Sequence, residues 1–435
     1  MLFRARLASA LFIILSLCAV NVKAQKAGVT EKSVGATDAD GASMARFEEL
    51  RAAGFESLYN LDYDSAVQKF KEIQMLFPDH PAGPQFLAAA LWSKVLNQSR
   101  RLQSSLYNSE SFYAQKEDKP DPQMLEQFRT LTRTAAQLAK ARLRRNPKDV
   151  EALYFLGATE GLKAAFGMTV QRSFMAALSD GSSSVDRHRE VIKLDPNFHD
   201  AELTIGLYDY VVGNLPAPVK LLASIVGTRG SKKRGLLTLQ RVATEGRWAQ
   251  DDAKSLLIVL FKREKRYDEA LALARELGAK YPRNYLFKLE AADALVSVAD
   301  KQRQAGQAAE SEKTEREVFA IFDSLLHDRA TRETASRAQD LIHFRYGEAL
   351  LEAGQLDTAA QEFLAGATVA GAESNLATMA HLHAARAFDL AGKRNDALAQ
   401  YRIVLARPDV MDSHDEARQG LKEPYKKKIE KNTEE

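Results

Sequence analysis

Four prolines that follow the same amphipathic pattern constrain the fold more than any other feature of this sequence. They are Pro78, Pro147, Pro196 and Pro282. An alanine lies twelve residues before three of them, at Ala66, Ala135 and Ala270. Proline cannot continue a helix, and it disfavours helical geometry in the residue that precedes it. Each proline therefore marks the end of one amphipathic helix and the start of another, so we expect an array of repeats, an architecture that usually binds partners.

The clearest repeat spans residues 45–78. Apolar residues recur at spacings of three and four in residues 45–59, a turn follows at residues 61–64, and a second helix continues to Phe77. The first helix contains Gly54, while the second has Ala66 near its start and Phe70 four residues later. Glycine and alanine allow two helix backbones to approach closely, and the phenylalanine fills the space between hairpins. This arrangement resembles the tetratricopeptide repeat.

The same pattern recurs in the second half of the chain. It is found at residues 266–282, 347–363 and 392–401, and three more divergent units lie between. The resemblance implies an all-α fold, an α-solenoid of stacked antiparallel helix hairpins that forms a superhelix. An unrelated helical bundle is the alternative. Residues 144–281 contain in order Asn-Pro at 146–147, Gly-Leu-Tyr-Asp-Tyr at 206–210, Leu-Pro at 215–216 and Arg-Gly-Leu-Leu at 234–237. This order is similar to that of exported bacterial proteins with these repeats, and loosely to that of a eukaryotic inclusion-clearance family, but neither likeness supplies an activity.

The first 24 residues have the pattern of a secretory signal peptide. Arg4 and Arg6 precede an apolar run from Leu7 to Val20, and small residues at 22–24 predict cleavage before Gln25. The alternatives are an uncleaved anchor helix and a lipoprotein modified at Cys18. We expect export to a periplasm or to the extracellular space.

Removal of this segment changes the charge and the cysteine content. The full chain has 61 basic and 58 acidic residues. The segment holds three basic residues and no acidic one, so the mature chain has equal numbers of each. This balance gives no reason to expect nucleic-acid binding. Cys18 is the only cysteine, so the mature protein would form no disulfide, which suits an oxidising compartment.

Composition divides the mature chain into five regions. Residues 25–43 are predicted to be a flexible linker, and residues 423–435 a charged tail. Residues 44–211 and 236–422 would form two arrays of repeats, separated by a Pro/Gly-rich interruption at 212–235. The prolines that end the repeats are irregularly spaced, so we expect residues in addition to the regular repeat near residues 98–122. We also expect a long first helix at 150–178, followed by a loop at 179–184, and either a helix extension or a loop at 301–317.

A search for catalytic signatures found none. No glycine-rich nucleotide loop, no nucleophile elbow and no His-Glu-x-x-His motif occurs in the sequence. His381 and His383 lie two apart on a predicted helix and would point in different directions, so they should not share a metal. We therefore expect no enzyme activity, no cofactor and no metal.

The resemblance also predicts where a partner would bind. In such arrays the first helices of successive hairpins line a concave groove, which suits an extended peptide or a helix of another protein. The chaperone-binding members hold a terminal carboxylate with Lys and Asn, which are absent from the corresponding positions here. For apolar candidates, packing in the core is an equally open alternative. The candidates are Arg51, Phe55, Tyr59, Leu207, Tyr210, Lys262, Arg263, Phe344, Glu348 and Arg386.

The sequence thus favours an exported scaffold that organises protein–protein contacts in the cell envelope. One alternative is a membrane-associated assembly factor, held by the signal region or by the basic clusters at residues 229–234 and 422–431. Membrane contact is not favoured, because a solvated loop and a solvated tail are the preferred explanation of these clusters. The other alternative is an enzyme with a site in the atypical region 160–235.

Overall fold

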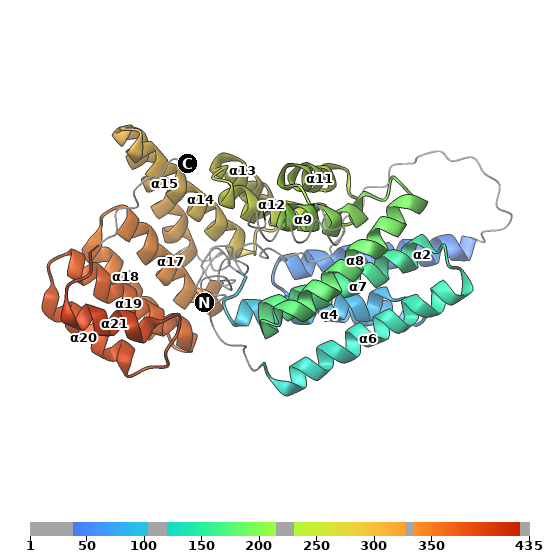
Figure 1. Cartoon of the computed structure of the whole chain (residues 1–435), viewed down its shortest axis with the longest axis horizontal. Coiled ribbons are helices and arrows are strands. Elements are labelled where there is room, and N and C mark those ends of the chain that lie inside the picture. Colours follow the sequence, from blue (N-terminus) through green and yellow to red (C-terminus); the bar gives the residue numbers. More distant parts are fainter. Residues whose placement is uncertain (1–37, 103–119, 215–229, 328–334, 427–435) are drawn as a thin grey trace. The chain divides into compact units, whose positions relative to one another are not determined.

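The computed structural model describes residues 38–102, 120–214, 230–327 and 335–426 of this protein (Figure 1). Within these ranges every regular element is a helix, and the elements form an α-solenoid of antiparallel hairpins, as predicted. The described residues divide into two compact units. The first contains the chain up to Arg266 together with residues 279–284, and the second contains residues 267–278 and the chain from Tyr285 onward.

The first unit consists of hairpins that pack in chain order. Each helix contacts the next one along the chain, from α2 to α12. The helices are α2 (Asp38–Tyr59), α3 (Tyr63–Leu76), α4 (Ala82–Gln98), α6 (Pro122–Arg145), α7 (Val150–Phe166), α8 (Phe174–Leu194), α9 (Glu202–Gly213), α11 (Lys232–Glu245) and α12 (Gln250–Arg263). Short π-helical (Gly167–Gln171) and 3-10 (His199–Ala201) segments precede α8 and α9.

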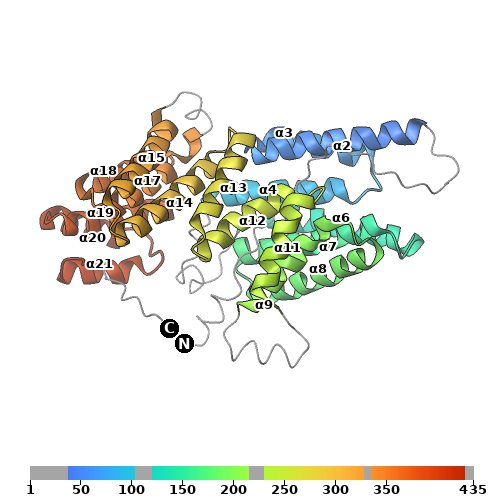
Figure 2. The same ribbon diagram turned by 90° about the horizontal axis from the view of Figure 1, so that it is seen from above.

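The second unit repeats this design with three further hairpins (Figure 2). Helix α13 (Tyr267–Lys280) is divided between the units, with residues 267–278 in the second and residues 279–280 in the first. The hairpins pair α14 with α15, α17 with α18 and α19 with α20, and α21 covers the last of them. These helices are α14 (Tyr285–Gln304), α15 (Ala308–His327), α17 (Gln339–Glu352), α18 (Leu356–Thr368), α19 (Ser374–Leu390), α20 (Arg394–Leu405) and α21 (Ser413–Lys422).

Small residues bring the paired helices together, as the repeat pattern predicts. A Cβ atom on Gly54 would lie 2.4 Å from the ring of Phe70, and one on Gly347 would lie 2.8 Å from the ring of Phe363. Both rings are fully buried. The glycine in the first helix therefore makes room for the aromatic ring of the second.

The turns within the hairpins share one backbone geometry. A single residue with positive φ lies two positions before the second helix of five hairpins. The next amide donates to a carbonyl five residues earlier, as in the bond from Gln355 N to Leu350 O (2.8 Å). Glycine occupies this position in three of the five turns, which accounts for the recurring Gly in the sequence pattern. The residues are Leu61, Lys265, Gly306, Gly354 and Gly392.

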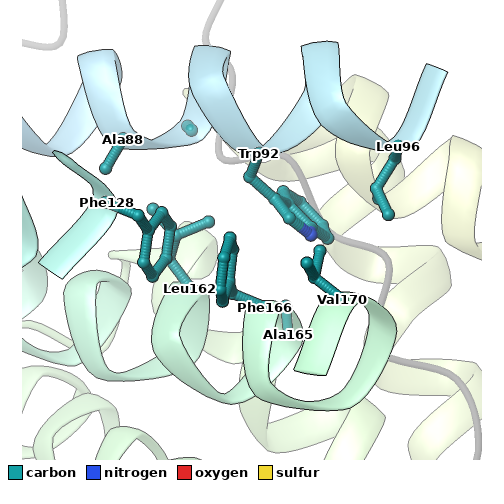
Figure 3. Packing of buried hydrophobic residues seen from close by; sticks show 9 residues of the cluster. Ala88, Trp92, Leu96, Phe128, Leu162, Ala165, Phe166 and Val170 are labelled. Carbon is teal, nitrogen blue, oxygen red and sulfur yellow. The ribbon is translucent and has the colours of Figure 1, made fainter. Parts of the chain in front are cut away.

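A buried aromatic cluster joins α4, α6 and α7 in the first unit (Figure 3). The rings of Phe128 and Phe166 stack with centroids 3.8 Å apart. The indole nitrogen of Trp92 donates to the hydroxyl of Thr169 at 2.9 Å, and this hydroxyl donates to a carbonyl in α7. The π-helical segment therefore turns the side chains of Thr169 and Val170 into the core.

This packing corrects the expectation for residues 150–184. The single helix expected at 150–178 is interrupted at residues 167–173, where Arg172 has a positive φ. The expected loop at 179–184 is instead helical and belongs to α8. Gly161 of α7 allows α8 to pack closely against α7 here, because a Cβ atom at residue 161 would lie 3.0 Å from the hydroxyl of Ser184.

Several predicted boundaries also shift. Helix α2 begins at Asp38, inside the expected linker, and residues 301–317 contain the end of α14, a short turn and the start of α15. Most of the expected interruption, residues 215–229, lies outside the described residues, and so do residues 1–37 and 427–435. Helices α9 and α11 on either side of 215–229 pack against each other within the first unit. Among the described helices, none has the length and apolar character needed to cross a bilayer.

Candidate binding groove

The inner face of the first unit is filled by its own side chains. Aromatic rings connect the first helices of three hairpins, from Phe55 of α2 to Phe86 of α4 (4.8 Å between centroids) and on to Phe155 of α7 (5.8 Å). The ring of Trp248, which precedes α12, lies 5.9 Å from that of Phe155. The first helices therefore meet in a core here, rather than line an open groove.

Arg51 is the most unusual member of this core. It is fully buried, pairs with Glu48 at 2.7 Å and lies over the ring of Trp248 at 6.0 Å. Burial lowers its pKa to about 10, although the carboxylate of Glu48 opposes the change. Phe55 and Tyr59 are buried as well. The expectation that these three residues face solvent in a groove is therefore wrong, because the inner face closes on itself.

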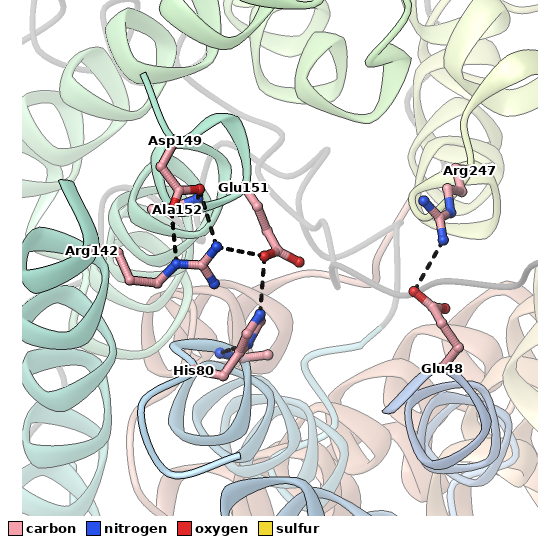
Figure 4. Close-up of polar contacts among 8 residues, drawn as sticks. Glu48, His80, Arg142, Asp149, Glu151, Ala152 and Arg247 are labelled. Carbon is pink, nitrogen blue, oxygen red and sulfur yellow. Dashed lines mark hydrogen bonds and ion pairs between the residues drawn. The ribbon is translucent and has the colours of Figure 1, made fainter. Parts of the chain in front are cut away.

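Ion pairs and hydrogen bonds also connect neighbouring hairpins of the first unit (Figure 4). Arg142 bonds both Asp149 (2.9 Å) and Glu151 (2.8 Å), and His80 approaches Glu151 at 3.3 Å. Burial alone would raise the pKa of Glu151, but its bonds with His80 and the charge of Arg142 lower it. These contacts connect the turn before α4 to α6 and α7, so the charged groups join neighbouring hairpins.

The candidates in α9 and α12 are also mostly interior. Leu207, Tyr210 and Lys262 are buried, and Arg263 is half-buried. The hydroxyl of Tyr210 donates to Glu264 at 2.6 Å, and burial followed by this bond raises its pKa. For Leu207 and Tyr210 the structure favours the alternative of core packing.

The second unit contains a cavity of about 220 Å³. It lies on the inner face, where α14, α17 and α19, the first helices of three successive hairpins, come together with α15. Apolar side chains supply part of its wall. The lining residues are Leu289, Asp293, Val296, Phe322, Arg345, Glu348, Ala349, Leu351, Glu352 and His383. This is where the resemblance places a binding groove, and we call this set the α14/α17/α19 groove.

An ion-pair network lies in this groove. Arg345 bonds Asp293 of α14 and, at 2.5 Å, Glu348 one turn along α17. Burial alone would lower the pKa of Arg345, but the carboxylates of Asp293, Glu348 and Glu290 outweigh it and raise the pKa. Burial raises the pKa of Glu348, and the nearby charge of Asp293 adds to this, even though Arg345 opposes it. The guanidinium of Arg345 therefore links carboxylates of α14 and α17 at the cavity.

His383 adds an unpaired polar atom to the groove. Its ring contacts Phe344 and Phe363, each with centroids 5.2 Å apart, and its Nδ1 has no hydrogen-bond partner among the described residues. Burial, with help from the charges of Arg386 and Arg345, lowers its pKa to about 3, so the ring is neutral at pH 7. His381 instead bonds Gln400 at 2.8 Å, so the two histidines do point to different places, as predicted.

Some of the residues predicted from the sequence lie at or near this cavity. Of the predicted residues in the second unit, Glu348 lines the cavity, Phe344 lies buried behind it and Arg386 lies close to His383. Sequence reasoning missed Asp293 and Arg345. Helical spacing offered a signal for Arg345, since residues 345, 348 and 352 follow one another at intervals of three and four along one face of α17.

Among the described residues, no group of three His, Cys, Asp or Glu side chains is arranged to hold a metal ion. No family model matches the sequence. No curated protein matches it either.

Solved structures with similar helical arrangements were found. The human IFIT1 dimer with m7Gppp-AAAA is similar to this chain with a TM-score of 0.45 and 14% identity, over 85% of this chain and 80% of that one. The human IFIT1 dimer with PPP-AAAA gives a TM-score of 0.45 and 12% identity, over 88% and 85%.

Proposed function

We propose that this protein is an exported, non-catalytic scaffold that binds a segment of a partner protein in the α14/α17/α19 groove. The single observation that carries the proposal is the cavity of about 220 Å³, whose walls combine apolar side chains with the charged side chains of Asp293, Arg345 and Glu348. Apolar walls with a few convergent polar groups are typical of binding sites. Export is supported by the pattern of residues 1–24, and a non-catalytic role by the lack of catalytic motifs in the sequence.

The position of the groove also favours a protein segment over a small molecule. The first helices of three consecutive hairpins supply its walls, so a peptide or helix lying across them would contact each hairpin in turn. The inner face of the first unit is occupied by its own aromatic side chains. We therefore assign partner binding to the second unit.

Site-specific crosslinking in the native host tests this proposal. A photoreactive amino acid at Glu352, which lines the groove, is expected to yield adducts with partner proteins. The matched control places the same group at Glu312, an exposed residue of α15 whose side chain is 71% accessible. Adducts from both positions alike, or from neither, would contradict a specific groove.

Export is tested separately by cell fractionation and by sequencing the amino terminus of the mature chain. We expect Gln25 to be the first residue. Recovery of the uncut chain in the cytoplasm would contradict the export part of the proposal while leaving the binding part intact.

A further inference from the structure

Helix α6 of the first unit has two faces of different character. On one face Phe128, Thr132, Ala135 and Ala139 are buried, and the helix packs against α4 and α7. The other face is exposed, and Figure 1 shows α6 at the outer edge of the first unit. The apolar face is therefore already occupied within the fold, and the exposed face is the one that can meet a partner.

Basic side chains follow one line along this exposed face. Successive residues of a helix turn by about 100°, so the four side chains lie within an arc of about 60° and extend over about 22 Å of the axis. Glu126 is the only acidic residue of α6, and two further exposed cations, Arg145 and Lys148, follow at its end. We call the four residues the α6 basic stripe; they are Arg129, Arg133, Lys140 and Arg144.

The fold does little to neutralise the stripe. Arg133 lies 3.8 Å from Glu126, but the two side chains are 60% and 62% accessible, and exposed pairs of this kind contribute little. Lys140 is near Glu160 of α7, on which Arg187 and Lys163 also act. Within the described ranges, Arg129 and Arg144 form no ion pair. The positive charge of the stripe is thus available to a partner.

The loop cluster that the sequence suggested for membrane contact differs in this respect. In residues 229–234, Lys232 pairs with Glu264 at 2.7 Å and Arg234 pairs with Asp209. Much of the charge of that cluster is therefore used within the first unit. The structure directs attention from that cluster to α6.

Helix stability alone does not favour the stripe. Cations four residues apart repel each other on a helix, and the stripe contains two such pairs, Arg129 with Arg133 and Lys140 with Arg144. Arg144 lies in the last turn, where it complements the negative end of the helix dipole. Arg129, Arg133 and Lys140 lie before that turn and gain little from the dipole. A partner that uses their charge gives this arrangement a physical reason.

We propose that the α6 basic stripe docks this protein on an anionic phospholipid bilayer. Neighbouring cations lie about 6–10 Å apart along the axis, close to the Debye length of about 8 Å, so their fields add at a flat surface. The contact is electrostatic and without insertion, because the apolar face of α6 is buried. A bilayer is favoured over a nucleic acid, since Phe128, the only aromatic residue of α6, is buried and cannot stack on bases.

This inference goes beyond the proposed function and does not depend on the groove, which belongs to the other unit. It gives the scaffold a second surface, which holds it at a membrane. The groove variant Glu348→Gln should therefore bind vesicles as the wild type does.

Sedimentation with vesicles tests the inference on the chain from Gln25 to Glu435. We expect binding to vesicles of equal parts phosphatidylcholine and phosphatidylglycerol, weaker binding at higher salt, and no binding to phosphatidylcholine alone. The stripe variant Arg129→Gln/Lys140→Gln/Arg144→Gln should weaken the binding about a hundredfold, because each cation near an anionic surface contributes about fivefold. The variant Arg129→Lys/Arg133→Lys/Arg144→Lys keeps the charge and should bind as the wild type does.

A matched control removes three exposed cations from other helices. Lys71→Gln/Lys313→Gln/Arg402→Gln changes the net charge of the chain by the same amount as the stripe variant and should leave vesicle binding within about twofold. Equal losses in the two triple variants, or equal binding to the two kinds of vesicle, would overturn the inference. So would a short single-stranded RNA that binds the stripe more tightly than the vesicles do, since the partner would then be a nucleic acid.

Discussion

The hydroxyl of Tyr59, the last residue of α2, donates a hydrogen bond to the carboxylate of Asp252 in the first turn of α12, 193 residues further along the chain. Two nearby contacts reinforce it. The ring of Tyr59 stacks on that of Tyr281 at 4.8 Å, and the side-chain amide of Asn284 donates to the carbonyl of Tyr59 at 2.7 Å. In an ideal solenoid each repeat contacts only its neighbours. The first unit departs from this rule, since its first hairpin meets its last helix.

Removal of the Tyr59 hydroxyl should weaken the contact between the first hairpin and α12. Tyr59→Phe deprives a buried carboxylate of a donor, and we expect the free energy of unfolding of the first unit to fall by about 1–3 kcal/mol. Tryptophan fluorescence during urea unfolding reports on this unit alone, because Trp92 and Trp248 are the only tryptophans and both belong to it.

Tyr208→Phe is the matched control for this experiment. Tyr208 is half-buried in the same unit, and the guanidinium of Arg189 lies over its ring at 5.7 Å, a contact that phenylalanine keeps. Loss of the Tyr208 hydroxyl should leave the unfolding curve unchanged. An equal effect of the two substitutions would mean that the bond between Tyr59 and Asp252 contributes nothing to the stability of the unit.

The contact between Tyr59 and Asp252 also shows why some parts of the structure could be predicted from the sequence and others could not. The hairpins depend on local signals, such as Gly54 and Phe70 at fixed spacing, and the sequence predicted them. The contact of Tyr59 with Asp252 joins distant hairpins and leaves no periodic signal. Helical spacing therefore placed Arg51 and Phe55 on the inner face correctly, but it did not show that this face is buried.

The groove of the second unit was only partly predictable for a related reason. Glu348 was selected because it faces inward on a first helix. Its partner Arg345 lies on the same helix, but Asp293 lies 52 residues before Arg345 in another hairpin. Such a pairing depends on how α14 and α17 pack, so it follows from the stacking of hairpins and not from the pattern within one repeat.

The close approach of α2 and α3 gives a second prediction. Gly54→Ala adds a methyl group that would lie 2.4 Å from the ring of Phe70, so the ring or the helices must shift. We expect a loss of about 1–3 kcal/mol in the stability of the first unit, even though alanine favours helix more than glycine does. Gly41→Ala in the same helix is the control, because no atom lies within 4 Å of the new methyl group. Urea unfolding that is unchanged by Gly54→Ala would show that the packing tolerates the methyl group.

The left-handed turn residues give a third prediction. Lys265 is exposed and has a φ of 58°, a conformation that costs a residue with a side chain about 1 kcal/mol more than glycine. Lys265→Gly should therefore stabilise the first unit by about 1 kcal/mol. Gly354→Ala at the equivalent turn of the second unit should do the opposite, since its φ is 76° and nothing lies within 4 Å to interfere. Thermal unfolding by circular dichroism measures both, and shifts of the same sign would contradict the argument.

A buried histidine predicts how the stability of the first unit depends on pH. His188 is 1% exposed, and its ring lies between the hydroxyl of Thr204 (2.5 Å from Nδ1) and the carbonyl of Tyr154 (3.1 Å from Nε2). Burial lowers its pKa to about 4, although the bond to Tyr154 opposes this. In the unfolded chain the pKa of histidine is about 6.5. Between these values only the unfolded chain binds the proton, so the contribution of His188 to stability is present above about pH 6.5 and is lost as the pH falls toward 4.

The comparison of wild type with His188→Gln isolates this contribution. As the pH falls from 7 to 4, the free energy of unfolding of the wild type should decrease by about 3 kcal/mol more than that of the variant, because glutamine does not titrate. The variant should be the less stable of the two at pH 7, where the packing of the imidazole ring against Tyr154 is intact. His327→Gln, which removes an exposed histidine of α15, should retain the pH dependence of the wild type. Parallel curves for wild type and His188→Gln, measured by tryptophan fluorescence in urea at each pH, would show that His188 becomes protonated without unfolding the hairpins around it.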